Sequence, residues 1–96
     1  MIPNAFQSAI ISKLKELRPK KIGVFGSYAR NENRPSSDLD ILIYLEPNAK
    51  VSLLKLIAAE QELTDCLRVQ VDLITERSLN PLIRPSVEKD LKIIFG

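Results

Sequence analysis

The chain has 96 residues, 27% of them charged, with a net charge of +2 and few aromatic side chains; this predicts one globular domain over residues 1–96 and gives no case for direct nucleic-acid binding. It contains no histidine, which excludes Ser-His-Asp chemistry and histidine-containing zinc sites, and its one cysteine excludes an internal disulfide. Neither a secretion signal nor a run of membrane-spanning length is visible, so we expect a cytoplasmic protein without a membrane partner.

The first predicted element is a helix over residues 4–17, because apolar residues recur there at helical spacing and Pro19 provides a stop. Basic residues gather between positions 13 and 21, and we interpret them as the solvated face and last turn of this helix rather than as an RNA-binding patch. A strand over residues 21–26 and a short helix at 27–31 are expected to follow.

A nearly continuous apolar run at residues 39–45 predicts a strand in the middle of a sheet. Four further elements are then expected in the second half of the chain. They are a helix at 51–66, a third strand at 69–75, short helical turns between 80 and 90 broken by Pro81 and Pro85, and a segment at 91–95 that is either a fourth strand, which we favour, or the end of a helix. This alternation of strands and helices predicts an α/β domain.

Two acidic residues, Asp38 and Asp40, stand where the second strand begins, and positions two apart on a strand point to the same face. Two carboxylates about 4 Å apart repel each other by roughly 1–4 kcal/mol, so a fold keeps such a pair where a cation lies between them. Hard oxygen ligands of this kind suit Mg²⁺, which usually completes its shell with water and substrate phosphates. The alternative for any isolated Asp-x-Asp is a solvated strand edge.

The segment Gly26-Ser27, which follows the first strand, supplies the matching feature for a phosphate group. Gly26 permits close approach of the main chain, the Ser27 hydroxyl can donate a hydrogen bond, and a helix beginning at 27 would present free N–H groups. Arg30 fits either a phosphate contact or a solvated helix charge, and the sequence leaves both open. Metal and phosphate sites side by side indicate phosphoryl or nucleotidyl transfer.

The pattern Gly26-Ser27, a spacer, then Ser37-Asp38-Leu39-Asp40 before an apolar strand resembles the DNA polymerase β-like nucleotidyltransferase superfamily, and is closest to its minimal members. The family has a third carboxylate on the next core strand, and Asp72 stands in a suitable apolar setting, although a lone strand acid can also simply face outward. Asn31 stands where many members have glycine; asparagine tolerates a left-handed backbone better than most residues.

The resemblance implies the nucleotidyltransferase fold, a small mixed sheet with helices packed on one side. It also implies a Mg²⁺-dependent enzyme, with two metal ions placed on the triphosphate of ATP. Its catalytic and metal-binding residues would be Asp38, Asp40 and Asp72. Its nucleotide-binding residues would be Gly26, Ser27 and Arg30.

Minimal members of this family are typically paired with an all-helical HEPN-domain protein in toxin–antitoxin systems. The resemblance therefore implies a protein adenylyltransferase that acts as antitoxin by placing AMP on a tyrosine of its toxic RNase partner. One alternative is a non-catalytic nucleotide- or partner-binding module that neutralises the partner by docking, but the retention of three acids argues against it. A second alternative is a small-molecule nucleotidyltransferase, for which 96 residues leave little room to build an acceptor pocket.

Overall fold

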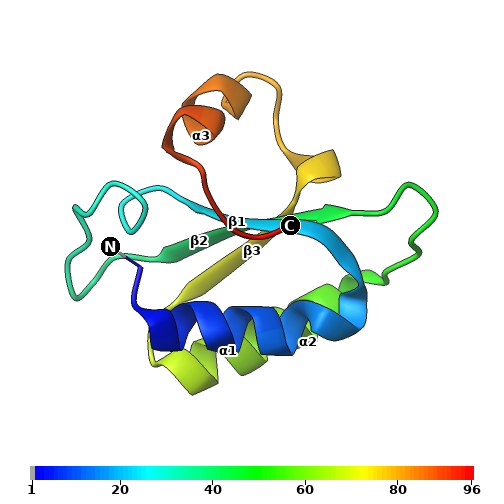
Figure 1. Ribbon diagram of the computed structural model, residues 1–96, viewed down its shortest axis with the longest axis horizontal. Helices are drawn as coiled ribbons and strands as arrows, with labels where there is room; N and C mark the ends of the chain where they lie inside the picture. The colour runs from blue at the N-terminus through cyan, green and yellow to red at the C-terminus, as the bar shows by residue number, and fades with distance from the viewer. Residues whose placement is uncertain (1) are drawn as a thin grey trace.

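The computed structural model describes residues 2–96, and its centre is a four-stranded sheet with helices on both faces (Figure 1). In chain order the elements are α1 (Asn4–Leu14), the 3₁₀ turn η1 (Lys15–Leu17), β1 (Pro19–Phe25), β2 (Leu39–Leu45), α2 (Leu53–Leu67), β3 (Val71–Thr75), the 3₁₀ turn η2 (Glu76–Ser78), α3 (Arg84–Asp90) and β4 (Lys92–Phe95). No helix among residues 2–96 has the length and apolar character needed to cross a bilayer.

The sheet has the strand order β3-β2-β1-β4, so β3 and β4 are its two edges. Strand β1 runs antiparallel to β2 and β4, whereas β2 and β3 are parallel. The mixed sheet expected from the resemblance is therefore confirmed. The register pairs Asp40 of β2 with Phe25 of β1 on one side and with Asp72 of β3 on the other.

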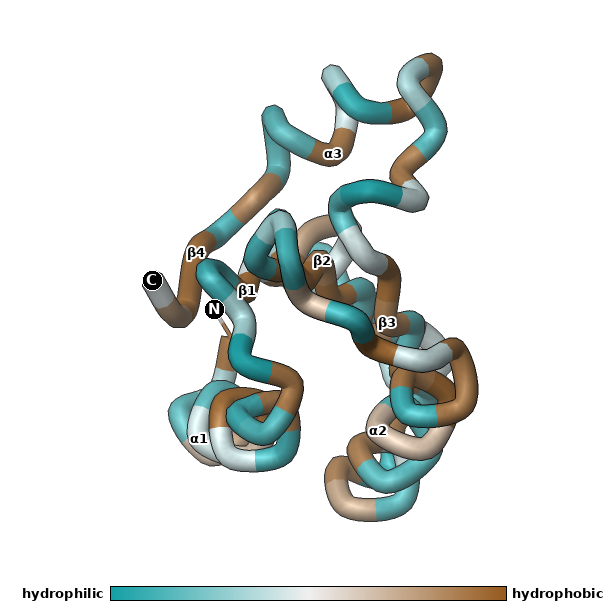
Figure 2. The backbone as a smooth tube through the Cα atoms, turned by 90° about the vertical axis from the view of Figure 1, so that its right-hand side faces the viewer, coloured by the Kyte–Doolittle hydropathy of each residue, from teal (hydrophilic) through white to brown (hydrophobic). Residues whose placement is uncertain are grey.

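Two helices, α1 and α2, cover one face of the sheet and enclose its main core (Figures 1 and 2). Strand β2 contributes its odd-numbered side chains to this core, and Leu39, Ile41 and Ile43 are fully buried there. At about 25 cal/mol per Å² of apolar surface, such side chains stabilise the fold by roughly 1.5–3 kcal/mol each. Because strand side chains alternate, the even-numbered ones face the other way.

The opposite face of the sheet is covered by α3, so the expectation that the helices lie on one side only is wrong. Val87 of α3 packs with Leu42 of β2 and with Leu79, which precedes α3. The physical reason is that β2 is apolar on both faces, and exposing Leu42 to water would be unfavourable. A smaller second core results, next to the place where Asp40 projects.

Most predicted elements are confirmed with shifts of a few residues at their ends. Strand β1 begins at Pro19, two residues earlier than expected, because Arg18 adopts a left-handed backbone (φ 54°) and turns the chain out of η1 at once. The Ser52 side chain caps α2 by accepting a hydrogen bond from the Lys55 amide at 3.1 Å. Pro85 does not break α3; it occupies the first helical turn, where no main-chain donor is lost.

Candidate active site

The three aspartates predicted from the sequence lie together at one end of the sheet, where β1 ends and β2 and β3 begin. Asp40 and Asp72 are register partners in the parallel β2–β3 ladder. Both have the strand parity of residues that face α3, such as Leu42 and Ile74. Asp38 is exposed just before β2, and its charge acts on both of the others.

Asp40 is the most perturbed of the three acids. It is half-buried, and this desolvation raises the pKa of its carboxyl from 3.8 to about 6. The negative charges of Asp72 and Asp38 add to the rise, as does a hydrogen bond that protonated Asp40 donates to Asp72, while the positive charge of Arg30 opposes it. The negative charges of the neighbouring Asp72 and Asp38, rather than burial, are what favour a cation at this place.

The pKa of the Asp72 carboxyl is raised by the same kinds of effect, burial and neighbouring negative charge. Burial raises the pKa of its carboxyl first, followed by the charges of Asp38 and Glu60. The hydrogen bond from Asp40 works in the opposite direction, because it stabilises the ionised form of Asp72. The two strand acids therefore share one proton more easily than they carry two negative charges.

The turn after β1 brings the main chain directly against Asp40. Gly26 has a φ of 74°, and a Cβ at this position would overlap the Oδ2 atom of Asp40. Only glycine combines this left-handed backbone with so close an approach. Tyr28 and Ala29 are buried in the main core, where the Tyr28 ring lies 6.1 Å from that of Phe6, and they anchor the turn.

The helix predicted at residues 27–31 is wrong, because the segment folds as consecutive turns. The Arg30 amide donates to the Gly26 carbonyl at 3.1 Å and the Glu32 amide to the Ser27 carbonyl at 2.9 Å. Asn31 has the left-handed backbone (φ 60°) for which asparagine is suited, and this ends the segment after one turn. Within residues 2–96 the amides of residues 27–29 donate to no main-chain carbonyl.

Arg30 is ion-paired, which the sequence did not reveal. Its guanidinium donates to Asp90 at the end of α3 (2.6 Å) and to Glu32 (3.2 Å), and these hydrogen bonds raise its pKa. Asp90 is 60 positions away in the chain, so no local pattern could have indicated the pairing. Arg30 nevertheless lies close enough to Asp40 to lower the pKa of that carboxyl.

The donor set is suitable for Mg²⁺ bound together with a nucleotide. Among residues 2–96, no three acidic, histidine or cysteine side chains are gathered tightly enough to hold an ion without further ligands. Mg²⁺ does not need such a cage, since it usually takes one or two carboxylates and fills its shell with water and phosphate oxygens. The neighbouring carboxylates of Asp40 and Asp72, with Asp38 beside them, meet that requirement.

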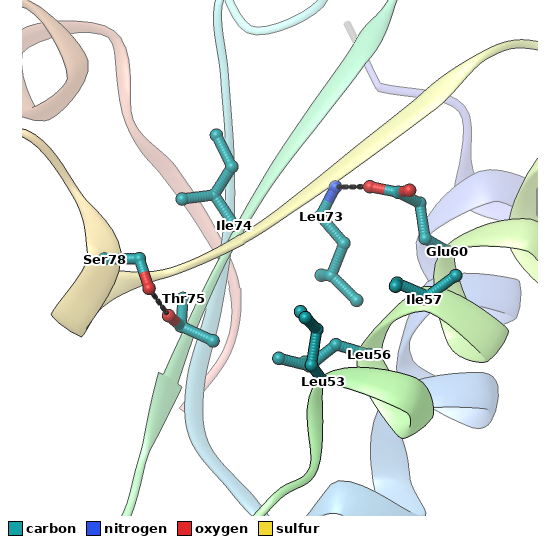
Figure 3. Close-up of a pocket in the computed structure, with 8 residues that line it drawn as sticks. All are labelled: Leu53, Leu56, Ile57, Glu60, Leu73, Ile74, Thr75 and Ser78. Atoms are coloured by element: carbon teal, nitrogen blue, oxygen red, sulfur yellow. Dashed lines mark hydrogen bonds between the residues drawn. The ribbon is translucent and has the colours of Figure 1, made fainter.

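A groove of about 270 Å³ runs along the outer edge of β3 against α2 (Figure 3). It is lined mainly by apolar side chains, among them the exposed Leu53 and Ile57, and it includes the two residues after Asp72, Leu73 and Ile74. The Glu60 carboxylate reaches across this groove and accepts a hydrogen bond from the Leu73 amide at 2.8 Å. No motif in the sequence includes Glu60.

Comparison with known proteins connects this geometry to a family. Residues 8–94 match the family described as the nucleotidyltransferase domain. A protein of Methanocaldococcus jannaschii, MJ0126, named provisionally as a protein adenylyltransferase, is 54% identical over 82 residues, which cover 82% of this chain and 81% of that protein. Protein adenylyltransferase MntA of Thermococcus cleftensis is 39% identical over 89 residues, covering 88% of each.

Solved structures that share the fold include examples with more than a quarter of the sequence identical. A toxin–antitoxin crystal structure with AMP-PNP gives a TM-score of 0.81 at 27% identity, covering 94% of this chain and 73% of that chain. A structure described provisionally as a minimal nucleotidyltransferase gives a TM-score of 0.76 at 34% identity, covering 92% of this chain and 88% of that chain.

Proposed function

This chain belongs to the nucleotidyltransferase domain family, as its motif predicted, and from that premise we propose that it transfers AMP from ATP to a hydroxyl group of a partner protein. The observation that carries the proposal is the set of three carboxylates brought together beside the Gly26 turn. The similarity to proteins named as protein adenylyltransferases, over more than four fifths of this chain, supports a protein as the acceptor.

On the donor side, the turn after β1 would hold the phosphates of ATP. The amides of residues 27–29 and the Ser27 hydroxyl are hydrogen-bond donors, and Gly26 lets a phosphate oxygen approach the main chain. Arg30 has five N–H donors and uses two of them on Asp90 and Glu32, so three remain for a phosphate. The AMP-PNP in a relative of the same fold supports ATP as the donor.

The carboxylates would hold two Mg²⁺ ions, with Asp38 and Asp40 on the donor side and Asp72 completing the second site. When bound, Mg²⁺ neutralises negative charge on the triphosphate and on the departing pyrophosphate. Burial is the main cause of the raised pKa of Asp40 and of Asp72, and repulsion among the acids adds to it; a bound cation would relieve that repulsion, which makes metal and nucleotide binding mutually supportive.

For the transfer itself, the hydroxyl oxygen of a partner tyrosine attacks the α-phosphorus of ATP, and the bond from that phosphorus to the pyrophosphate breaks. The hydroxyl proton passes to a base, for which Asp72 is placed on the acceptor side. As the acid of edge strand β3, beside Asp40 in the parallel ladder, Asp72 is the carboxylate to which we assign this role. The products are a tyrosine carrying AMP in phosphodiester linkage and free pyrophosphate.

The partner we propose is an HEPN-type toxin RNase, and the role of this chain is that of its antitoxin. A toxin–antitoxin complex among the structural relatives supports this assignment. Docking of the two proteins would place the tyrosine next to the nucleotide and convert a two-body reaction into a positioned one. The added AMP would bring negative charge and bulk to the RNase and so oppose RNA binding. We propose that both proteins act in the cytoplasm.

ATP labelled at the α-phosphate separates this function from its alternatives. The purified chain is incubated with Mg²⁺, the labelled ATP and its co-purified partner protein, and then with candidate hydroxyl-bearing small molecules. Label on the partner supports the proposal, and label on a small molecule supports a small-molecule nucleotidyltransferase. Absence of label, with the partner still inhibited, supports a module that acts by docking alone.

A further inference from the structure

Strand β3, which carries Asp72, is an edge of the sheet, and alternate residues along it point their main-chain groups outward. The Leu39 amide of β2 donates to the Gln70 carbonyl at 2.8 Å, which fixes the parity of the ladder. The main-chain groups of Asp72 therefore face β2, whereas the N–H groups of Val71 and Leu73 face away from the sheet. Unpaired amides of this kind normally bind water or another strand.

Both outward amides are instead bonded to side chains of α2. Thr64 Oγ1 accepts from the Val71 amide at 3.1 Å. Glu60 Oε2 accepts from the Leu73 amide at 2.8 Å, as Figure 3 shows. Residues four apart on a helix lie on one face about 6 Å apart along the axis, and amides two apart on a strand are about 6.6 Å apart. The spacing of the acceptors thus matches the spacing of the donors.

We propose that Glu60 and Thr64, together named the edge clamp, are positioning residues. They hold the Asp72 carboxylate in the position needed for AMP transfer to the acceptor. The proposal rests on the proposed function and adds two residues of α2 to it. Asp72 sits between the two clamped residues and is tied to β2 through its own main chain. Its position is therefore fixed from both sides of the strand, although β3 is an edge.

The two hydrogen bonds from α2 fix the start of β3, which an edge strand alone would hold less firmly. An edge strand lacks one of its two neighbours, so its first residues open more easily than those of β2. The bond from the Leu73 amide to the Glu60 carboxylate is charge-assisted, which makes it stronger than a bond between neutral groups. A displacement of about 1 Å at a reacting group can cost roughly a hundredfold in rate, so this bond bears directly on turnover.

The variants Glu60→Ala and Glu60→Gln test the edge clamp, with Glu62→Ala as a matched control. Alanine removes the acceptor, whereas glutamine keeps an acceptor oxygen and removes only the charge. Glu62 is an exposed acid of the same helix, and within residues 2–96 its one ion pair is with Lys13 at 3.7 Å. For Glu60→Ala we expect kcat for AMP transfer to fall about tenfold with the KM for ATP changed less than about twofold.

In Glu60→Gln, kcat should return to within about threefold of the wild type, because the hydrogen bond is retained. Glu62→Ala should leave kcat unchanged. Thr64→Val, which preserves shape, gives a second route if Glu60→Ala folds poorly, with a smaller loss of kcat expected. The proposal is overturned if Glu60→Gln is as impaired as Glu60→Ala, or if kcat and ATP affinity fall in parallel.

Amide hydrogen exchange of the metal-free protein keeps this test separate from the test of the proposed function. Loss of the Leu73 bond in Glu60→Ala should speed exchange at that amide by roughly tenfold or more, with little change in Glu60→Gln and in Glu62→Ala. If the wild type transfers no label to any acceptor, the proposed function fails, and this measurement still decides whether the clamp holds β3. Unchanged exchange at Leu73 in Glu60→Ala would overturn the clamp.

Discussion

Replacing Asp40 by asparagine should stabilise the metal-free protein at neutral pH while removing its activity. The folded state raises the pKa of Asp40 from 3.8 to about 6, so between these values the folded protein binds more protons than the unfolded chain. Stability contributed by this group is therefore present at low pH and is lost as the pH rises through about 4 to 6. Asparagine has no proton to lose, stays neutral at every pH and so avoids that penalty.

The size of the effect follows from the pKa values and the exposure of the carboxyl. The interval from 3.8 to about 6 corresponds to about 3 kcal/mol if it is carried fully into stability. Asp40 is only half-buried, and solvent screening reduces the expected gain in the free energy of unfolding to about 1 kcal/mol. For a chain of this length, that raises Tm by roughly 4–8 °C.

Urea unfolding in the presence of a chelator, at several pH values from 3.5 to 7.5, measures the effect. Asp40→Asn should be more stable than the wild type at pH 7.5, and the difference should vanish below about pH 4, where the wild-type carboxyl is protonated. Asp65→Asn, the same change at an exposed acid of α2, is the control. Added Mg²⁺ should stabilise the wild type and not Asp40→Asn. If Asp40→Asn is less stable than the wild type at pH 7.5, the ionised Asp40 carboxylate does not destabilise the metal-free fold.

Three further predictions concern the same site. Gly26→Ala should lower the free energy of unfolding by at least about 1 kcal/mol, because Gly26 has a φ of 74° and an added Cβ would overlap Asp40. The same variant should not bind Mg²⁺·ATP in calorimetric titration, and intact binding would argue against the turn as the phosphate site. Asp72→Asn should impair AMP transfer and spare ATP binding more than Asp40→Asn does, and equal losses in both assays would place Asp72 on the donor side instead. ATP should bind far more weakly in a chelator than with Mg²⁺, and equal affinity would count against a metal-bridged nucleotide.

The placement of the acids could be predicted from the sequence, because it depends on the strictly local alternation of a strand. Asp38 and Asp40 share a face at the mouth of an apolar strand, and the next predicted strand carries Asp72. The parallel register that sets Asp72 beside Asp40 is a tertiary fact, which no local pattern in the sequence fixes. The need for glycine at position 26 is seen only once Asp40 is known to lie against it.

One error has a local cause, and the others occurred where distant residues decide the conformation. The segment 27–31 was expected to be helical, but Asn31 ends it after one turn while Tyr28 and Ala29 turn into the core. Helix α3 covers the second sheet face by packing on Leu42. The residues of β2 alone do not indicate which later segment covers Leu42. The contacts of Arg30 with Asp90 and of Glu60 with Leu73 join separate elements and leave no periodic signal.

Whether this chain transfers AMP to a protein is decided by the intact mass of both proteins after co-expression with the candidate partner, the product of the neighbouring reading frame. We predict a helical partner of the HEPN type that co-purifies with this chain and carries one or more added AMP groups. The same partner co-expressed with Asp40→Asn should be unmodified and remain active as an RNase. A partner that stays unmodified, yet is neutralised equally by the wild type and by Asp40→Asn, would contradict the account and establish inhibition by docking alone.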